Sequence, residues 1–367
     1  MTFLRCAWYC FGWSHEISRQ PLSRTILATP IVLFRKEDGS AVALGDTCPH
    51  RFAPLHLGEL RGDAIECRYH GLQFGENGAC ILNPHGPIAR TLKVRPFPVV
   101  ERQQVVWIWM GEPGSADPML IPDCSHNDDP AFKTFFGQVH VGGHYELVND
   151  NLLDLTHVRF LHKSFQAPNS GIFEHNVVQQ GRTVTSVYNI RDTEKSAMLE
   201  MMWPEGPGRV DIFSVMRWDA PSNLLQKNCN TGVGISEDDG IVAFTSHLIT
   251  PETETSSNYF FSYSRNWRRE DPAFEAALRG GIEHAIRDDD AAMIQHIQRR
   301  MGPTGDLMSL RPVVLSTDSA AIRARRILAK LISEESQSEG PRKEAAAPEV
   351  ASAPIPAPVK SLEGAGG

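Results

Sequence analysis

The segment CPHRFAPLHLGELRGDAIECRYHG, residues 48–71, constrains the fold of this chain more than any other stretch. It contains two pairs of metal-ligating residue types, Cys48 with His50 and Cys67 with His70, and sixteen residues separate the pairs. Structural zinc sites usually combine CxxC or HxxxH pairs. Here each pair mixes one thiol with one imidazole, which predicts two loops that converge on one metal centre.

Mixed pairs suit a 2Fe–2S cluster in which two thiolates hold one iron and two imidazoles the other, because each loop then supplies one ligand to each metal. Neutral imidazoles leave less negative charge around the cluster, which raises its reduction potential. This is the Rieske arrangement, and structural zinc is the alternative. The predicted ligands are Cys48, His50, Cys67 and His70. The nearby His56 and His85 lie at no ligand spacing, so we expect solvated or hydrogen-bonded loop histidines.

Composition limits the possible partners and the compartment. The 367 residues are enough for two folded units, and the net charge of −8 is spread without a basic face for nucleic acid. No apolar run approaches the roughly 20 residues of a membrane helix, and no signal pattern opens the chain. We therefore expect a soluble, cytoplasmic protein with reduced thiols. The cysteines outside the motif, expected to be ordinary thiols, are Cys6, Cys10, Cys80, Cys124 and Cys229.

The pattern along the chain predicts an α+β protein with two domains. Short β-type runs such as TILATPIVLF and QQVVWIWMG indicate an all-β domain over residues 1–115, followed by a linker over 116–130. Helical segments near 147–163 and 271–301 and β-type runs such as IVAFTSHLIT indicate a sheet-and-helix domain over 131–332. Residues 333–367 are rich in Ala, Pro, Glu and Ser, which predicts a disordered tail.

The segment 271–301 has clear helix signals, with Asp271 as N-cap and Pro272 at the first helical position. Apolar residues recur at helical spacing along it, which predicts that one stripe faces a core. The stripe consists of Phe274, Leu278, Ile282, Ile286, Met293 and Ile297.

A second metal site is suggested by VNDNLLDLTHVRFLH, residues 148–162. On an ideal helix His157 and His162 diverge by about 140°, so the spacing alone is weak, and two unrelated histidines are the alternative. Downstream of a Rieske segment, however, the pair fits two legs of a 2-His-1-carboxylate triad, which leaves iron positions open for oxygen.

The third ligand is expected from IRDDDAAMIQHIQRR, residues 286–300. Helical phase turns Asp288 away from the apolar stripe, whereas Asp289 and Asp290 lie on its two borders, where a carboxylate is costly without a cation. Phase alone does not choose between Asp289 and Asp290.

The motif segment and NDNLLDLTHVRFLH together resemble the oxygenase components of Rieske non-haem iron oxygenases, nearest to the dicamba and vanillate O-demethylase branch and its chloroacetanilide N-dealkylase-type members. The resemblance runs from MTFLRCAWY at the start to RPVVLSTDSAAIRARRILAKL, ending at residue 331. It implies an N-terminal Rieske domain and a C-terminal catalytic domain with an antiparallel sheet, helices and one mononuclear Fe(II).

The resemblance also implies roles for individual residues. Its register places Asp290 on the iron, with Asp289 as an acidic neighbour. Asp154 should connect His157 to His70 of the next subunit in a homotrimer, since a carboxylate between two imidazoles fixes their tautomers. Asn151 should lie beside the iron without binding it.

The pocket residues implied by the resemblance are His247, Gln226 and Gly281. His247 would hydrogen-bond a substrate carbonyl or carboxylate, or be an ordinary strand histidine. Gln226 and Gly281 stand where the branch has Asn and Trp. The loss of an indole opens space in the pocket and removes a hydrogen-bond donor that a carboxylate could use. This favours a bulkier, neutral aromatic substrate over a small benzoate.

The implied reaction uses O2 and two electrons to hydroxylate an alkyl C–H next to N or O, so that the product collapses and loses the alkyl group as an aldehyde. N-dealkylation of chloroacetanilide-type anilides is favoured, and O-demethylation of a methoxyarene is the alternative. A ring-hydroxylating dioxygenase and a Rieske electron carrier are less favoured. Because no GxGxxG motif follows a strand, NAD(P)H should act only indirectly, through a ferredoxin and its reductase.

Overall fold

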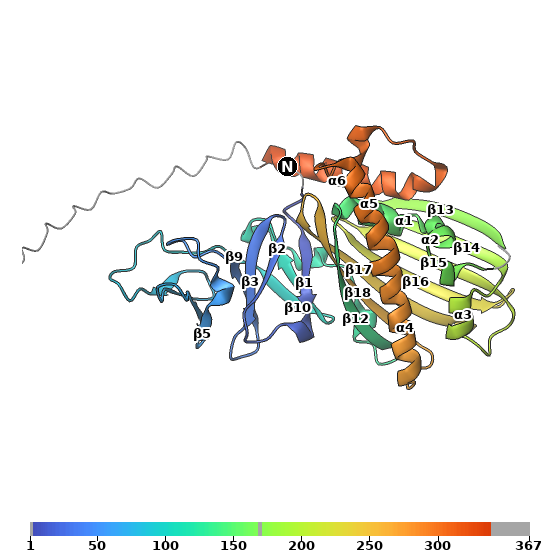
Figure 1. Ribbon diagram of the computed structural model, residues 1–367, viewed down its shortest axis with the longest axis horizontal. Coiled ribbons are helices and arrows are strands. Elements are labelled where there is room, and N and C mark those ends of the chain that lie inside the picture. The colour runs from blue at the N-terminus through green and yellow to red at the C-terminus, as the bar shows by residue number, and fades with distance from the viewer. Residues whose placement is uncertain (1–2, 168–170, 339–367) are drawn as a thin grey trace, which may run out of the picture.

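The computed structural model describes residues 3–167 and 171–338. An N-terminal β unit and a larger sheet-and-helix unit lie side by side (Figure 1), which confirms the expected α+β class. Within the described ranges, no helix combines the length and the apolar character required to cross a membrane.

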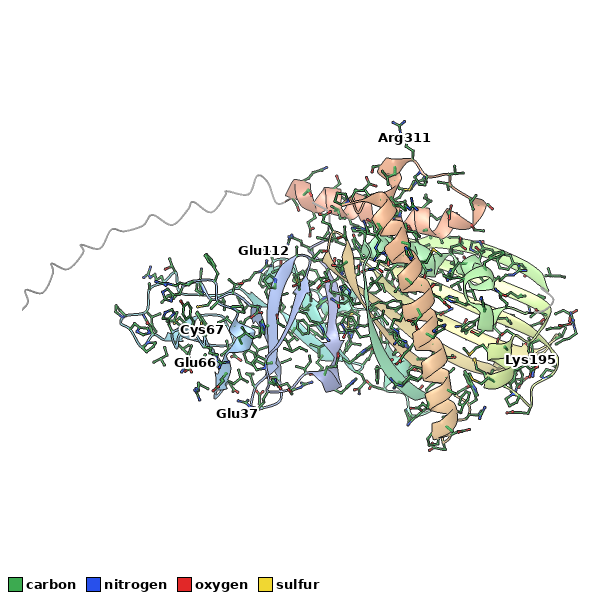
Figure 2. The ribbon with its side chains drawn as sticks, in the orientation of Figure 1. Glu37, Glu66, Cys67, Glu112, Lys195 and Arg311 are labelled. Carbon is green, nitrogen blue, oxygen red and sulfur yellow. The ribbon has the colours of Figure 1, made fainter. Side chains whose placement is uncertain are left out.

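The N-terminal unit contains three small antiparallel sheets in its described residues. The cluster motif lies in the last of them, at the end of the unit farthest from the catalytic sheet, where Figure 2 labels Cys67. The first sheet consists of β1 (Trp8–Trp13), β11 (Val105–Trp109) and β10 (Val99–Arg102). The second consists of β2 (Leu22–Ile26), β3 (Thr29–Arg35), β4 (Ala41–Gly45) and β9 (Pro96–Phe97). The third consists of β5 (Glu59–Arg61), β6 (Ala64–Glu66), β7 (Gln73–Phe74) and β8 (Cys80–Leu82).

The catalytic unit is built on one antiparallel sheet of seven described strands, in the order β12-β18-β17-β16-β15-β14-β13. Polar and apolar residues alternate along several of these strands, which gives the sheet one face toward the helices and another toward solvent or the N-terminal unit. The strands are β12 (Lys133–Val141), β13 (Ile172–Gln180), β14 (Thr183–Glu194), β15 (Arg209–Asp219), β16 (Asn223–Gly232), β17 (Ile241–Thr253) and β18 (Ser256–Arg265).

Helices cover this sheet, and the long rod of α4 and α5 crosses in front of it (Figure 1). Asp271 accepts a hydrogen bond from the Phe274 amide and Pro272 opens α4, as the sequence predicts. The helices are α1 (Tyr145–Leu153), α2 (Val158–Leu161), α3 (Ala197–Met202), α4 (Pro272–His284), α5 (Ala292–Met301) and α6 (Ser319–Ser338).

A π-helical turn, Ala285–Ala291, joins α4 to α5. A π-turn adds one residue to the repeat and shifts the phase of everything after it. Phe274, Leu278 and Ile286 are buried as expected. Beyond the turn the prediction is wrong: Met293 and Ile297 are exposed, and the buried positions have moved to Ile294, Gln298 and Met301.

The helix expected near 147–163 is interrupted. α1 ends at Leu153, a single 3₁₀ turn follows over Leu155–His157, and α2 then begins at Val158. Asp154 causes the break, because its side chain accepts from the Thr156 amide and so caps a new turn instead of continuing the old one. The ideal-helix angle between His157 and His162 therefore does not apply.

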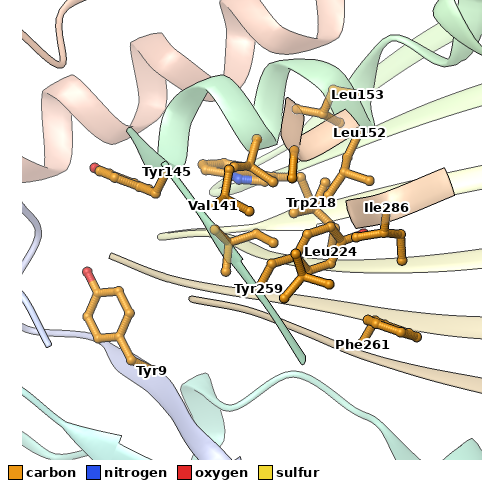
Figure 3. Close-up of a cluster of buried hydrophobic side chains, with 14 of the residues drawn as sticks. Tyr9, Val141, Tyr145, Leu152, Leu153, Trp218, Leu224, Tyr259, Phe261 and Ile286 are labelled. Atoms are coloured by element: carbon orange, nitrogen blue, oxygen red, sulfur yellow. The ribbon is translucent and has the colours of Figure 1, made fainter. Parts of the chain in front are cut away.

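The two units share a continuous apolar core. Tyr9 of the N-terminal unit packs in the same cluster as Val141, Tyr145 and Trp218 of the catalytic unit (Figure 3). Hydrogen bonds reinforce the contact: the indole of Trp13 donates to the Gly137 carbonyl at 3.0 Å. The expected linker over 116–130 is not a loose connection, because its Ile121 and Cys124 are buried. All seven cysteines are free thiols.

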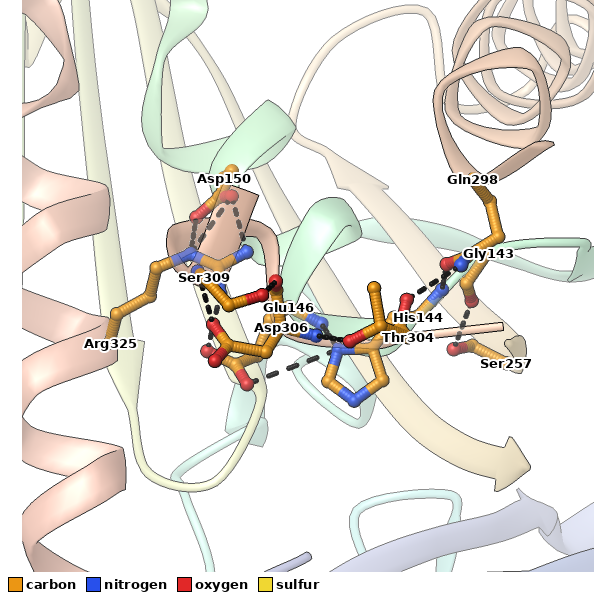
Figure 4. Close-up of polar contacts among 10 residues, drawn as sticks. All are labelled: Gly143, His144, Glu146, Asp150, Ser257, Gln298, Thr304, Asp306, Ser309 and Arg325. Atoms are coloured by element: carbon orange, nitrogen blue, oxygen red, sulfur yellow. Dashed lines mark hydrogen bonds and ion pairs between the residues drawn. The ribbon is translucent and has the colours of Figure 1, made fainter. Parts of the chain in front are cut away.

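Arg325 of α6 fastens the C-terminal helix to α1 (Figure 4). Its guanidinium donates to Asp150 at 2.6 Å and to Glu146 at 2.8 Å. At the far end of α6 the buried Glu335 accepts the backbone amides of Arg5 and Cys6. The predicted start of the tail at residue 333 is therefore too early, because α6 continues to Ser338. The rest of that tail, residues 339–367, lies outside the described residues.

His144, which caps the N-terminus of α1, gives the fold a pH dependence. Burial, followed by the nearby Arg325 cation, lowers the pKa of His144 to about 3. A folded-state pKa below the ordinary 6.5 contributes stability that is present above pH 6.5 and lost as the pH falls toward 3.

The substitution His144→Asn keeps a capping side chain and removes this titration. We expect the loss in unfolding free energy between pH 7 and pH 5 to become smaller by about 2 kcal/mol, measured by urea titration at both pH values. The variant should still lose some stability in acid, because burial also lowers the pKa of His126 to about 4. An identical pH dependence in both proteins would contradict this role.

Candidate active site

The two cluster loops have matching backbone geometry. In each, the cysteine amide donates to the carbonyl five residues later, Cys48 to Ala53 at 2.9 Å and Cys67 to Leu72 at 2.7 Å. In each, the cysteine carbonyl accepts from the residue four positions on, which has positive φ. Gly71 adopts this conformation at no cost, whereas Phe52 at φ 57° adopts it as a strained and 78% exposed aromatic.

The four predicted cluster ligands converge. Cys48 and Cys67 are both buried and adjacent, and burial raises the pKa of the Cys48 thiol, so a thiolate there needs a cation beside it. The rings of His50 and His70 lie 4.5 Å apart between their centroids. Nδ1 of His70 is buried without a hydrogen-bond partner among the described residues. Two thiols, two imidazoles and an orphaned ring nitrogen fit the two irons of a Rieske cluster.

The two other histidines of this region are hydrogen-bonded, as expected of loop histidines. His56 binds the buried carboxylate of Asp46, which also accepts from the hydroxyl of Ser23. His85 uses Nε2 to contact the His70 carbonyl at 2.9 Å. Each histidine thus has a hydrogen-bonded ring nitrogen, and both contact residues of the cluster region.

In the catalytic unit, the fold brings His157, His162 and Asp290 together, with candidate ligand atoms within 4.8 Å of one another. Oδ1 of Asp290 lies 3.4 Å from Nε2 of His157 and 3.3 Å from Nε2 of His162. Burial alone would raise the pKa of Asp290, but the two histidines hold it at about 2. A charged carboxylate facing two imidazoles suits a divalent cation with open coordination positions.

The ring of His162 lies between two consecutive carboxylates. Nε2 faces Asp290, and Nδ1 hydrogen-bonds Oδ2 of Asp289 at 3.0 Å. Burial lowers the pKa of His162, yet the bonds to Asp290 and Asp289 leave it raised overall. The geometry thus distinguishes the two acids that helical phase left open: Asp290 points to the candidate metal position, and Asp289 orients the ring. Asp288 is exposed and binds His284 and Arg287 instead.

His157 contacts the backbone of Asp154 and not its side chain, which differs from the expected contact. Its Nδ1 hydrogen-bonds the backbone carbonyl of Asp154 at 2.6 Å, while the Asp154 carboxylate is taken up by Thr156. The predicted side-chain bond from Asp154 to His157 is therefore absent among the described residues, because that carboxylate caps the helix break. Asn151 lies beside the triad as expected and donates to Oδ1 of Asp290 at 3.0 Å.

The triad opens into a cavity of about 300 Å³ between the sheet and the helices. Its helix wall is apolar, with Met198, Leu199, Leu278 and Ile282. Its sheet wall on β15, β16 and β17 carries uncharged polar side chains beside the apolar Ile212 and Met216, and the polar ones are Ser214, Gln226, Asn228, Asn230, Thr245 and His247. Among the described lining residues the only Lys or Arg is Arg159, which is exposed. A buried carboxylate would therefore lack a cation partner at the sheet wall.

The predicted pocket residues Gln226 and His247 both line this cavity. Nε2 of His247 contacts Oε1 of Gln226 at 3.2 Å, and Nδ1 contacts the Tyr259 hydroxyl at 2.5 Å. Burial lowers the pKa of His247 to about 3, so the ring is neutral. Both ring nitrogens have protein partners, so His247 has no free donor for a substrate.

The expected opening at Gly281 is not found. Gly281 is not a lining residue of the cavity, and a Cβ at this position would lie 2.8 Å from the methyl carbon of Met198. The flexible methionine fills the volume that an aromatic side chain would take. The other polar wall residues, Asn228 and Asn230, were not predicted, although polar residues alternate through QKNCN from Gln226.

The contact between Asp289 and His162 can be tested by mutation, with the neighbouring Asp288 as the control. Asp289→Ala removes the acceptor for Nδ1 of His162, and loss of such a supporting partner costs roughly 10- to 100-fold in metal affinity. We expect that drop in ferrous affinity, measured by competition with a chelator, and a partial loss for Asp289→Asn. Asp288→Ala should bind iron as the unmodified chain does. Equal affinities for the Asp289→Ala and Asp288→Ala variants would show that Asp289 does not support the site.

Comparisons with known proteins agree with this geometry. Residues 7–96 match the Rieske 2Fe–2S domain family, and residues 141–334 match the vanillate O-demethylase oxygenase C-terminal domain. The oxygenase component of dicamba O-demethylase from Stenotrophomonas maltophilia is 39% identical over 334 residues, which cover 90% of this chain and 98% of that one. The oxygenase component of chloroacetanilide N-alkylformylase from Rhizorhabdus wittichii is 36% identical over 330 residues, covering 89% and 94%.

The fold is similar to solved structures as well. A crystal structure of dicamba monooxygenase bound to 3,6-dichlorosalicylic acid aligns with a TM-score of 0.85 at 37% identity, covering 92% of this chain and 99% of that one. Both sequence and structure are thus matched over nearly the whole described chain. The chain belongs to the Rieske non-haem iron oxygenases, as the terminal oxygenase component of a monooxygenase with one 2Fe–2S cluster and one mononuclear iron.

Proposed function

We propose that this oxygenase hydroxylates an alkyl C–H next to N or O in a small neutral aromatic compound and so dealkylates it, with N-dealkylation of a chloroacetanilide-type anilide favoured. The observation that carries this proposal is the cavity with an uncharged sheet wall into which His157, His162 and Asp290 open. Among the described lining residues, the buried walls offer amides and hydroxyls but no Lys or Arg for an acidic substrate. The similarity to a chloroacetanilide N-alkylformylase component supports the same substrate class.

In this proposal Cys48, His50, Cys67 and His70 hold the cluster, and the triad holds the mononuclear iron. When bound, these groups supply electrons and the place where oxygen is activated. The chain's own residues fix ligand orientation through Asp289 and the Asp154 carbonyl. The apolar helix wall keeps water from the ring of the substrate. Overall, one oxygen atom enters the C–H bond and two electrons and two protons convert the other to water. The hydroxylated product then collapses and releases the oxidised carbon, as an aldehyde from an N-alkyl or O-alkyl group and as a formate ester from an N-alkoxymethyl group.

O-demethylation of a methoxyarene is the second candidate, and the higher identity to a dicamba O-demethylase component favours it. Both reactions place the same kind of C–H at the same triad. They differ in what the remote part of the cavity must bind, because an anilide is neutral whereas dicamba-type substrates carry a carboxylate. Within the part of the lining that the structure describes, Arg159 is the one Lys or Arg that would serve an acidic substrate.

A panel of substrates tests the proposal. With a ferredoxin, its reductase and NADH, formation of the dealkylated aromatic product should be measured by chromatography for an N-alkoxymethyl chloroacetanilide, a neutral methoxyarene and a methoxybenzoate. We expect the highest kcat/KM for the anilide and the lowest for the benzoate, since the sheet wall cannot pair a carboxylate. The control His157→Ala should form no dealkylated product from any of them. A preference for the methoxybenzoate would overturn the neutral substrate class and favour the second candidate.

We also infer that the active unit is a homotrimer that receives electrons from a separate ferredoxin. The cluster loops around Cys67 lie at one end of the chain, and the triad lies in the catalytic unit beyond the whole N-terminal β unit (Figure 2). A neighbouring subunit would bring a second cluster to the triad. The exposed Phe52 and Tyr69 of the cluster loops are available for such a contact, and Asp154 would meet the partner's cluster histidine.

Sedimentation of the loaded enzyme tests the assembly. We expect a particle of three chains, and Asp154→Asn should retain both metal centres while cluster reoxidation after substrate addition becomes slower. A monomer that turns over substrate at full rate, or an Asp154→Asn variant with unchanged reoxidation, would contradict electron transfer between subunits.

A further inference from the structure

The sheet wall of the cavity carries a row of side-chain amides along β16. Gln226, Asn228 and Asn230 are two residues apart, so they project from the same face of the strand, and all three line the cavity. On the neighbouring strands Ser214 lies opposite Asn228 and Thr245 opposite Gln226. We call Gln226, Asn228 and Asn230 the amide row.

A chain of hydrogen bonds from Tyr259 through His247 fixes which groups of the amide row donate and which accept. Burial and the Asp290 carboxylate raise the pKa of Tyr259, so its hydroxyl stays protonated beside the neutral ring of His247. Because Oε1 of Gln226 only accepts, Nε2 of His247 carries the proton and donates, and Nδ1 accepts from Tyr259. The Gln226 amide then donates to Ser214 at 3.1 Å and to Oδ1 of Asn228 at 3.3 Å.

The far end of the row has unused hydrogen-bonding capacity. Asn230 is 8% exposed, yet its carboxamide makes no hydrogen bond to any residue that the structure describes. The oxygen of Asn228 accepts from Gln226, and its NH₂ group likewise donates to no residue of the described chain. Buried polar side chains are almost always paired in proteins, so the unpaired carboxamide of Asn230, which is buried and lines the cavity, indicates a group that binds there.

The row also places this unused capacity away from the triad. The His247 and Tyr259 end is close enough to Asp290 to feel its charge. Asn230 follows Gln226 by four residues, about 13 Å of strand. A ligand that reaches from the His247 end of the row to Asn230 must therefore be elongated, with its ring against Met198 and Leu278 of the apolar wall.

We propose that Asn230, together with the amide of Asn228, binds an uncharged carbonyl group at the end of the substrate opposite the reacting C–H bond. The proposal rests on the dealkylating function for the orientation of the ligand and extends it by assigning a second recognition point. The substrate class is an alkoxy- or N-alkyl aromatic with an amide or ketone across the ring. A carboxylate is excluded from this position because no cation among the described lining residues lies on the sheet wall.

Three probes of one shape test the assignment on the loaded enzyme: 4-methoxybenzamide, 4-methoxybenzoate and 4-ethylanisole. Their dissociation constants should be measured by calorimetry, and formaldehyde release should be recorded separately. We expect the benzamide to bind tightest. Asn230→Leu keeps the side-chain volume, and it should weaken the benzamide about tenfold while leaving 4-ethylanisole unchanged. Asn230→Gln keeps a carboxamide and should preserve much of the preference.

Thr231→Val is the matched control, because Thr231 is buried on the opposite face of β16. It should leave all three dissociation constants unchanged. Equal weakening of the benzamide and 4-ethylanisole by Asn230→Leu, tighter binding of the benzoate than of the benzamide, or no saturable binding of the benzamide would each overturn the assignment. Benzamide binding that depends on Asn230 without formaldehyde release would support the assignment and count against the dealkylating function.

Discussion

The imidazole of His162 is held between two successive carboxylates, and the surrounding helices are shaped to make this possible. Nδ1 meets Asp289 and Nε2 meets Asp290, although neighbouring residues on a regular α-helix point about 100° apart. The π-turn over Ala285–Ala291 widens the helix at this point and brings both acids to one ring. Without that turn, one of the two carboxylates would face away from the ring and the metal position would lose a ligand or its support.

The opposite side of the site depends on a second interruption. The helix break at Asp154 frees a backbone carbonyl, and this carbonyl orients His157. A continuous helix would use that carbonyl in its own ladder and separate the two histidines. Arg325 anchors α1 immediately before the break through Asp150 and Glu146, so a partly buried ion pair holds this end of α1 against α6. Two irregular segments, each fixed by polar contacts, therefore build one metal site against a regular sheet.

Much of this could be read from the sequence, and the exceptions have physical causes. Cys48, His50, Cys67 and His70 were predicted because their spacing encodes ligand chemistry directly. His157, His162 and Asp290 were also brought together by the fold, although ideal-helix geometry argued weakly for the pair. The burial of Met293 and Ile297 was predicted wrongly because the π-turn shifts the helical phase and the apolar pattern before it gives no sign of that turn. The space expected at Gly281 was filled by Met198, a contact between distant segments that residue identity alone does not reveal.

The polar wall was missed for a related reason. An alternating polar strand usually faces solvent, and only the arrangement of β15, β16 and β17 under the helices turns Asn228 and Asn230 into cavity residues. The substrate class therefore depends on how the strands and helices pack around the cavity, whereas the cofactor class can be predicted from the spacing of the ligand residues in the sequence.

Anomalous diffraction at the iron edge, from crystals of the loaded enzyme, tests the central claim most directly. The account predicts one mononuclear peak in the catalytic unit, bounded by Nε2 of His157, Nε2 of His162 and a carboxylate oxygen of Asp290, with Asp289 on the far side of the His162 ring. A peak at Asp288 and His284, or an iron ligated by Asp289 instead of Asp290, would contradict it.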